Sequence, residues 1–184
     1  MLIAEPIRKS IGDSRLELVI GNIVMEDTEA IVNPAQKSLH PGGGADGEIH
    51  IWGGPRIWEE CRELGGCEPG QAKITTGGDL AARYVIHTVG PIWTGGGSNE
   101  AEVLASCYRE CLRIAVEHNI ASIAFPAIST GDYAYPMELA APIAIGTVVA
   151  HLSDHAGPRL VRFVLKGRRA FELHNSALQA IVSV

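Results

Sequence analysis

A run of glycines between an apolar segment and a helix-forming segment constrains this chain more than any other feature. The apolar run 29–32 leads into a loop that contains the glycines 42–44, and a helical pattern begins at Ala45 or Asp46. The first N–H groups of a helix have no intrahelical partner and carry the positive end of the helix dipole, so the place suits a phosphate. Glycine also lets backbone approach a ligand closely, although glycine loops are often plain turns.

Asp46 is the one acidic residue of this loop. A carboxylate repels phosphate, so its presence predicts a chemical or hydroxyl-binding role. The structural alternative is a helix N-cap or first-turn residue, which stabilises a helix by about 1 kcal/mol. The two roles are compatible.

The same loop also matches the dinucleotide fingerprint G-x-G-x-x-G at residues 42–47. In that fingerprint the glycines follow their strand directly, whereas about nine residues separate Val32 from Gly42 here. A nicotinamide-dependent oxidoreductase therefore stays only as an alternative.

Length and charge bound the class of protein. The chain has 184 residues, 46% of them hydrophobic and 20% charged, which suits one globular domain over 1–184 with an N-terminal extension at 1–14. The formal net charge of −6 argues against nucleic-acid binding. An anionic ligand would have to be held by backbone amides.

The cysteines predict a reducing compartment. Cys61, Cys67, Cys107 and Cys111 form no Cys-x-x-Cys pair and no secreted disulfide framework. The last two share a helical face and are expected in the core rather than on zinc. The N-terminus lacks a signal peptide, and the longest apolar run, 139–150, is too short for a bilayer. We expect a cytoplasmic protein with no membrane partner and no metal.

Hydrophobic periodicity predicts alternating strands and helices. Expected strands cover 15–21, 29–32, 72–76, 84–89, 122–126 and 159–165, and expected helices cover 46–64 with a break at 53–55, 98–118, 136–152 and 170–182. Ser98 or Asn99 is the expected cap of the third helical segment. This alternation is typical of an α/β sheet with helices on both faces. The loops 32–46 and 126–136 would then converge on one crevice, and two anion-holding loops suit a diphosphate.

Four ordered stretches resemble the macrodomain family, which binds ADP-ribose. Residues 21–23 (Gly-Asn-Ile) resemble the family's Gly-Asp-Ile, and 30–36 with 42–50 resemble its Ile-Val-Asn-Ala-Ala-Asn and Gly-Gly-Gly-Val-Asp-Gly-x-Ile-His. Residues 73–75 and 84–91 match typical family strands, and 129–136 resemble Ser-Thr-Gly-x-Phe/Tyr-Gly-Tyr-Pro. The resemblance runs from about Arg15 to Val182.

The resemblance implies a three-layer αβα sandwich around a mixed sheet, and a set of site residues. It places adenine near Asn22 and Ile23 and the distal ribose near Tyr133, Asn33, Gln36 and Asp46. The diphosphate would lie between two loops, formed by Gly42, Gly43, Gly44 and Ala45 and by Ser129, Thr130, Gly131 and Asp132.

The hydrolase branch of the family resembles this chain most. The resemblance implies that this protein cleaves ADP-ribose esters, namely ADP-ribosylated acidic side chains and O-acetyl-ADP-ribose, without a metal or other cofactor. Asp46 would activate water, with Gln36 and Asn33 beside it. The chain departs from the family pattern at three positions, with Asn22 in place of aspartate, Pro34 in place of alanine and Gln36 in place of asparagine. Because of these departures, a non-catalytic ADP-ribose reader remains the alternative.

Overall fold

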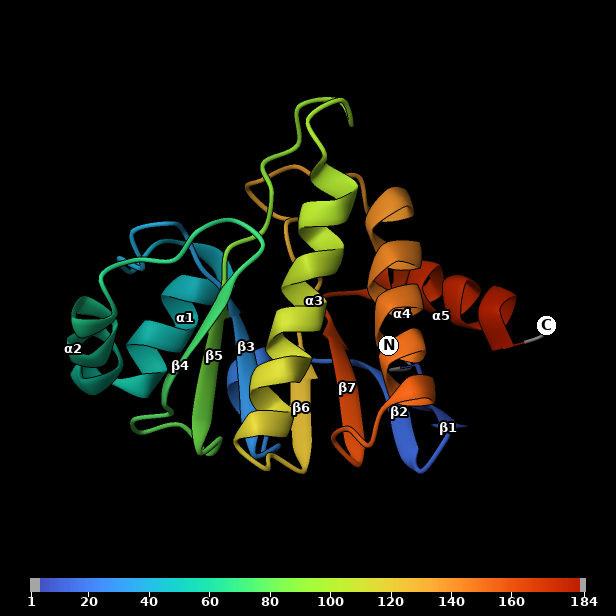
Figure 1. Cartoon of the computed structure of the whole chain (residues 1–184), viewed down its shortest axis with the longest axis horizontal. Coiled ribbons are helices and arrows are strands. Elements are labelled where there is room, and N and C mark those ends of the chain that lie inside the picture. Colours follow the sequence, from blue (N-terminus) through green and yellow to red (C-terminus); the bar gives the residue numbers. More distant parts are fainter. Residues whose placement is uncertain (1–3, 183–184) are drawn as a thin grey trace.

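The computed structural model describes residues 4–182, which build a mixed sheet of seven strands between two layers of helices (Figure 1). The sheet order is β1-β2-β7-β6-β3-β5-β4. The five inner strands are parallel, and β1 and β4 pair antiparallel at the two edges. The strands are β1 Ile7–Ile11, β2 Ser14–Ile20, β3 Ala30–Pro34, β4 Ala72–Thr76, β5 Tyr84–Thr88, β6 Ser122–Phe125 and β7 Leu160–Leu165.

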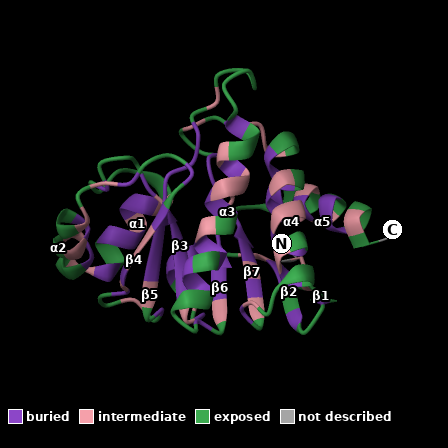
Figure 2. Cartoon of the chain, in the orientation of Figure 1, coloured by how far each residue is buried: buried purple, intermediate pink, exposed green. Residues whose placement is uncertain are grey.

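The helices divide between the two faces. A hydrophobic cluster joins α3, α4 and α5 to one face, and a second cluster joins η1, α1 and α2 to the other. Figure 2 shows the inner strands largely buried between these layers. The helices are the 3-10 helix η1 Ile23–Met25 and α1 Gly44–Gly53, α2 Pro55–Leu64, α3 Glu100–Glu117, α4 Met137–Asp154 and α5 Arg168–Val182. Within residues 4–182, no helix is long and apolar enough to cross a membrane.

Most expected elements are confirmed to within a few residues at each end, including the break between α1 and α2. The N-terminal extension contains the edge strand β1, and residues 1–3 of that extension lie outside the described part. The expected side-chain cap of α3 is wrong. Asn99 occupies the N-cap position in a left-handed conformation (φ 63°) and makes no capping hydrogen bond. The carboxylate of Glu100 instead accepts from the loop backbone at Gly96 and Ser98.

The connections that follow two neighbouring inner strands run to opposite faces of the sheet. β3 leads into α1 on one face, whereas the adjacent β6 leads into α4 on the opposite face. Connections that leave neighbouring parallel strands in opposite directions open a crevice at the carboxyl ends of those strands, where ligands bind in open α/β sheets. The topology therefore positions a site beyond Pro34 and Phe125.

Candidate functional site

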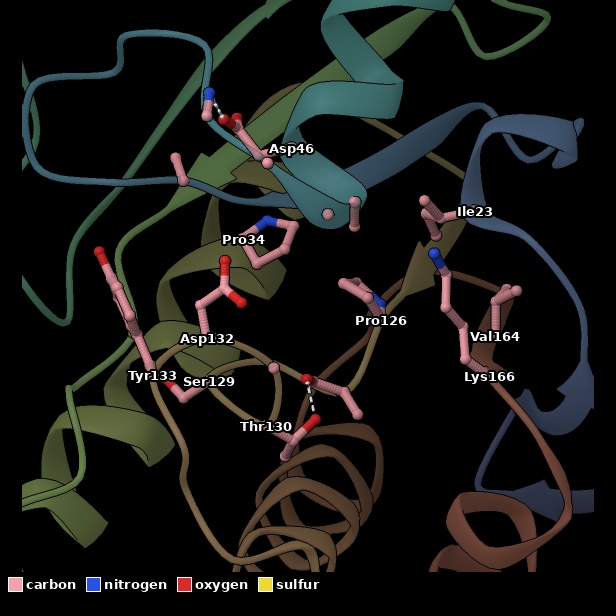
Figure 3. A pocket seen from close by; sticks show the side chains of 18 of the residues that line it. Ile23, Pro34, Asp46, Pro126, Ser129, Thr130, Asp132, Tyr133, Val164 and Lys166 are labelled. Atoms are coloured by element: carbon pink, nitrogen blue, oxygen red, sulfur yellow. Dashed lines mark hydrogen bonds between the residues drawn. The ribbon is translucent and has the colours of Figure 1, made fainter.

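A cavity of about 470 Å³ lies at this crevice (Figure 3). The first residues after the carboxyl ends of β2, β3, β6 and β7 all reach it. In the view of Figure 3, Tyr133 and Asp132 lie toward one end and Ile23, Val164 and Lys166 toward the other. The lining residues are Gly21, Ile23, 34–36, 42–46, Gly90, Pro126, Ala127, 129–133, Met137, Val164, Lys166 and Ala170.

One wall is the start of α1. Gly43 is its N-cap and supplies no side-chain acceptor, and Gly44 follows with φ +57°. The first amides of the helix therefore face the cavity rim without a capping side chain, as an anion site requires. Gly47 holds the loop close, because a Cβ there would lie 2.6 Å from the carbonyl oxygen of Gly42.

The facing wall is the loop between β6 and α4. Ser129 takes a left-handed conformation (φ 66°), and the Tyr135 N–H donates to the Ser129 carbonyl at 2.9 Å. The Ser129 hydroxyl is buried without a hydrogen-bond partner in the described chain. Gly90 makes room for this residue, since a Cβ there would approach the Ser129 hydroxyl to 2.0 Å. A strained, close-packed loop of this kind indicates a shape fixed for ligand binding.

Asp46 lies in the first turn of α1 with both carboxylate oxygens engaged. Oδ1 accepts from Asn33 Nδ2 at 2.6 Å, and Oδ2 accepts from the Gly42 N–H at 2.5 Å. The side chain is largely buried, with the residue 6% exposed, yet it lines the cavity. Its carboxylate is therefore fixed in direction and bridges the glycine loop and β3.

These contacts keep Asp46 ionised. Burial by itself would raise the pKa of Asp46, but the nearby His50 and hydrogen bonds from Asn33 and the Gly42 amide outweigh burial and hold the pKa below its ordinary value. A carboxylate with a lowered pKa is a weak base but a permanent acceptor. It can orient a water molecule or a ribose hydroxyl across the working pH range.

His50 supports Asp46 from one helical turn further on. Its Nε2 lies 3.5 Å from Asp46 Oδ1, within ion-pair reach. Neither ring nitrogen makes a well-formed hydrogen bond in the described chain. His50 thus affects Asp46 through its closeness to the carboxylate and not through a well-formed hydrogen bond.

The structure brings most of the predicted site residues to the cavity, from Ile23 through the two loops to Tyr133. Asn33 is an exception, because it is fully buried behind Asp46 and does not line the cavity. Asn22 is a second exception, since its Nδ2 donates to Glu48 Oε2 at 2.7 Å and its Oδ1 accepts from the Val24 N–H at 3.4 Å. The Gln36 amide reaches the rim but donates to the His40 carbonyl at 2.8 Å.

Sequence reasoning missed the wall formed by the end of β7 and the start of α5. Val164, Lys166 and Ala170 line the cavity there, and Lys166 is the one cationic side chain among the described lining residues. Its ammonium pairs with Glu48 Oε1 at 3.1 Å. The signal was present, because Lys166 directly follows an apolar strand just as the two predicted loops do. Residues 4–182 contain no group of three or more His, Cys, Asp or Glu side chains arranged to hold a metal ion.

Comparison with known proteins agrees with this architecture. The family model for the macro domain matches residues 32–144. A macro domain-containing protein of Chlorobaculum tepidum is 51% identical over 90% of this chain and 96% of its own length. An O-acetyl-ADP-ribose deacetylase of Cronobacter sakazakii is 46% identical over 89% of this chain and 93% of its own.

Solved structures give the same result. The Oceanobacillus iheyensis macrodomain with ADP superposes with a TM-score of 0.93 at 38% identity, covering 97% of both chains. The Trypanosoma brucei macrodomain in complex with ADP-ribose superposes with a TM-score of 0.83 at 34% identity, covering 89% of this chain and 68% of that one. The fold is thus an αβα sandwich with a ligand crevice at a topological switch point. This chain belongs to the macro domain family.

Proposed function

We propose that this protein binds ADP-ribose in the cavity and hydrolyses ADP-ribose esters, with Asp46 orienting the attacking water. The observation that carries the proposal is a carboxylate fixed in direction by two hydrogen bonds, in the wall of a cavity lined by two glycine-containing loops. The names of the relatives support it, since several are O-acetyl-ADP-ribose deacetylases.

The cavity suits a dinucleotide-like diphosphate. The start of α1 and the loop 129–133 present backbone on opposite sides, and backbone amides can hold two phosphates where Lys166 is the one cation among the described lining residues. Ile23 and Val164 give the end that also holds Lys166 an apolar surface suited to a base, and Tyr133 at the other end suits a sugar. In this orientation the ester on the distal ribose lies beside Asp46.

The hydrolysis needs one water and one proton transfer. Water adds to the acyl carbon, the bond from that carbon to the ribose oxygen breaks, and the ribose oxygen takes a proton. Asp46 holds the water by accepting one of its hydrogen bonds. Because the pKa of Asp46 is lowered, the carboxylate is a poor final resting place for the water proton, which passes on to the departing ribose oxygen.

Turnover of O-acetyl-ADP-ribose and of a glutamate-linked ADP-ribosyl protein tests the proposal. Asp46→Asn keeps the shape and the contact with the glycine loop but removes the charge. We expect kcat to fall about 100-fold or more, while calorimetry shows ADP-ribose affinity close to that of the unaltered protein. Equal turnover by both proteins would overturn the role of Asp46.

A non-catalytic reader is the second candidate, and the Gln36 contact favours it. The Gln36 amide already donates to His40, so it is not free to position a ribose unless the loop rearranges. A reader would bind ADP-ribose and show no turnover of either ester. Better binding of NAD than of ADP-ribose would instead indicate the dinucleotide alternative.

A further inference from the structure

Three buried polar side chains stand in a row beneath Asp46 on adjacent strands. Asn33 of β3 pairs in register with His87 of β5, and Thr75 of β4 lies two residues from the partner of His87. Asn33 and His87 are fully buried, and Thr75 is 5% exposed. Since side chains alternate along a strand, all three point to the face covered by α1 and α2. Buried polar groups carry a cost unless each has its partner, so the row needs an explanation.

The hydrogen bonds of this row run in one direction. Asn33 Nδ2 lies 2.6 Å from Asp46 Oδ1 and 3.0 Å from His87 Nδ1. An ionised carboxylate only accepts, so the amino end of the Asn33 carboxamide must face both groups. His87 Nδ1 is then an acceptor, and the imidazole proton is on Nε2.

Thr75 completes this assignment. Its Oγ1 lies 2.8 Å from His87 Nε2 and accepts that proton, while its own hydroxyl donates to the Thr76 carbonyl at 3.0 Å. The hydroxyl therefore selects the imidazole tautomer that can accept from Asn33. Burial, with the nearby His50, lowers the pKa of His87 to about 3, so the ring stays neutral.

The alternative orientation of Asn33 shows what the row prevents. If the carboxamide turned over, its Oδ1 would face the Asp46 carboxylate at hydrogen-bond distance and repel it. Asn33 Oδ1 has no hydrogen-bond partner of its own in residues 4–182, so the oxygen atom does not favour either orientation of the amide. The acceptor nitrogen of His87 and the Asp46 carboxylate are the groups that select the orientation.

We propose that His87 is a positioning residue for Asp46: through the tautomer fixed by Thr75 it locks the Asn33 amide with its donor toward the carboxylate. The inference rests on the proposed function for its effect on turnover. Its effect on the carboxylate itself is independent of any reaction. Asp46 lines the cavity and His87 does not, so His87 acts on a bound ligand only through Asn33 and Asp46.

Other titratable groups surround the row. His50 approaches from α1, with its ring centroid 6.3 Å from that of His87, and Glu60 and Cys61 approach from α2. Burial raises the pKa of Cys61 to about 12, so this thiol stays neutral. Tyr133 faces Asp46 from the opposite loop, and burial raises the pKa of its phenol. A His50→Gln background therefore removes the ionisable side chain that lies 3.5 Å from Asp46 Oδ1.

The experiment compares two matched pairs of variants. Thr75→Val keeps the side-chain shape but removes the hydroxyl that selects the tautomer, and Thr75→Ser restores it. His87→Phe fills the ring volume without an acceptor, and His87→Asn keeps an acceptor near the position of Nδ1. The readouts are the carbon-13 carboxyl titration of Asp46, measured with and without His50→Gln, and kcat against pH.

We expect the pKa of Asp46 to move up toward its ordinary value in Thr75→Val and His87→Phe and to stay low in the other two. The acid limb of the kcat profile should move to higher pH in the same two variants, and kcat should fall by up to about 100-fold, with little change in ADP-ribose affinity. Thr75→Val keeps the test available if His87→Phe does not fold.

An unchanged Asp46 titration in folded Thr75→Val would overturn the proposal. If the unaltered protein turns over neither ester, the proposed hydrolysis fails, while the carboxyl titration still decides the role of His87.

Discussion

The Asn22 amide donates to Glu48 across the gap between η1 and α1, at 2.7 Å from Nδ2 to Oε2. The same carboxylate accepts from Lys166 at 3.1 Å, so the three side chains link η1, α1 and the end of β7 at the rim of the cavity. This contact changes what a return to the family's aspartate at position 22 would do. Two carboxylates would then face each other at hydrogen-bond distance.

We expect Asn22→Asp alone to raise ADP-ribose affinity little or not at all, because repulsion from Glu48 opposes any gain at the base. Glu48→Gln removes that repulsion, so the double variant should bind more tightly than the sum of the single changes predicts. A double-mutant cycle by titration calorimetry measures this coupling. Additive effects would show that Glu48 and position 22 act independently.

Gly47→Ala should weaken ADP-ribose binding. The new Cβ would lie 2.6 Å from the Gly42 carbonyl oxygen, and backbone cannot yield there without moving the Gly42 N–H that holds Asp46. We expect a loss of about tenfold or more in affinity and a lower Tm, measured by calorimetry and thermal unfolding.

Gly146→Ala is the matched control for that change. Gly146 lies inside α4 away from the cavity, and a Cβ there would meet only Ile181 Cδ1 at an ordinary 3.7 Å. It should raise stability by about 0.5 to 1 kcal/mol and leave binding unchanged. Equal binding by the Gly47 and Gly146 variants would contradict the tight contact at Gly42.

Glu17 should make stability fall at acid pH. It is buried on β2, where Arg8 of β1, Arg15 and Arg162 of β7 surround its carboxylate at 2.9 to 3.2 Å. Burial by itself would raise the pKa of Glu17, but the arginines outweigh it and hold the pKa below the ordinary 4.5. The stabilisation is therefore complete above pH 4.5 and is lost as pH falls through the lowered value.

Glu17→Gln tests this by urea denaturation at a series of pH values. We expect a loss of about 1 to 2 kcal/mol at pH 7, less than for a dry ion pair because Arg8 and Arg15 are themselves half exposed. The difference from the unaltered protein should vanish below the folded pKa of Glu17. Glu117→Gln, at an exposed pair with Arg113, should change stability little at any pH.

Glu100→Gln should loosen the loop before α3 and, through it, Tyr133. The Glu100 carboxylate accepts from the Thr94 hydroxyl and from the backbone of Thr94, Gly96 and Ser98. These bonds, led by that of the Thr94 hydroxyl, lower the pKa of Glu100 to about 2, so they persist until the pH approaches that value. The neighbouring Trp93 N–H donates to the Tyr133 carbonyl at 2.9 Å.

The expected result is faster hydrogen exchange at Gly96 and Ser98 and weaker ADP-ribose binding, since a glutamine cannot accept from all of these donors. Glu102→Gln, on the exposed side of the same helix, is the control and should leave both unchanged. Unchanged exchange in Glu100→Gln would mean that the loop holds its shape without the carboxylate.

Sequence patterns predicted the fold well because strands and helices here follow local hydrophobic periodicity. The β3 and β5 segments are short and apolar, and α2 begins at a proline and ends at Gly65 in a left-handed conformation. The strand order was beyond such reasoning, since pairing depends on contacts between distant segments. The cap of α3 was mispredicted because Glu100, a residue inside the helix, took the role expected of Ser98 or Asn99.

The lining of the cavity was predicted where loop backbone forms it and was missed where it depends on the direction of a side chain. The loops at 42–46 and 129–133 reach the cavity because glycine and strand ends set their course. The Asn33 amide hydrogen-bonds to Asp46 and lies against His87, and the Asn22 amide donates to Glu48. These partners are distant in the sequence, so the direction of the two side chains could not be predicted from it. Lys166 was missed because its place directly after an apolar strand was not read as the signal that it was for the two glycine-containing loops.

β3 lies between β6 and β5, and its carboxyl end forms part of the cavity wall. The amides of a central strand exchange with solvent mainly when the whole molecule unfolds, whereas edge strands and loops open separately. A ligand bound at the end of β3 therefore raises the free energy of global unfolding. The increase depends on the ratio of ligand concentration to Kd. Ligand addition will slow exchange throughout the inner strands and not only at the two loops that touch it.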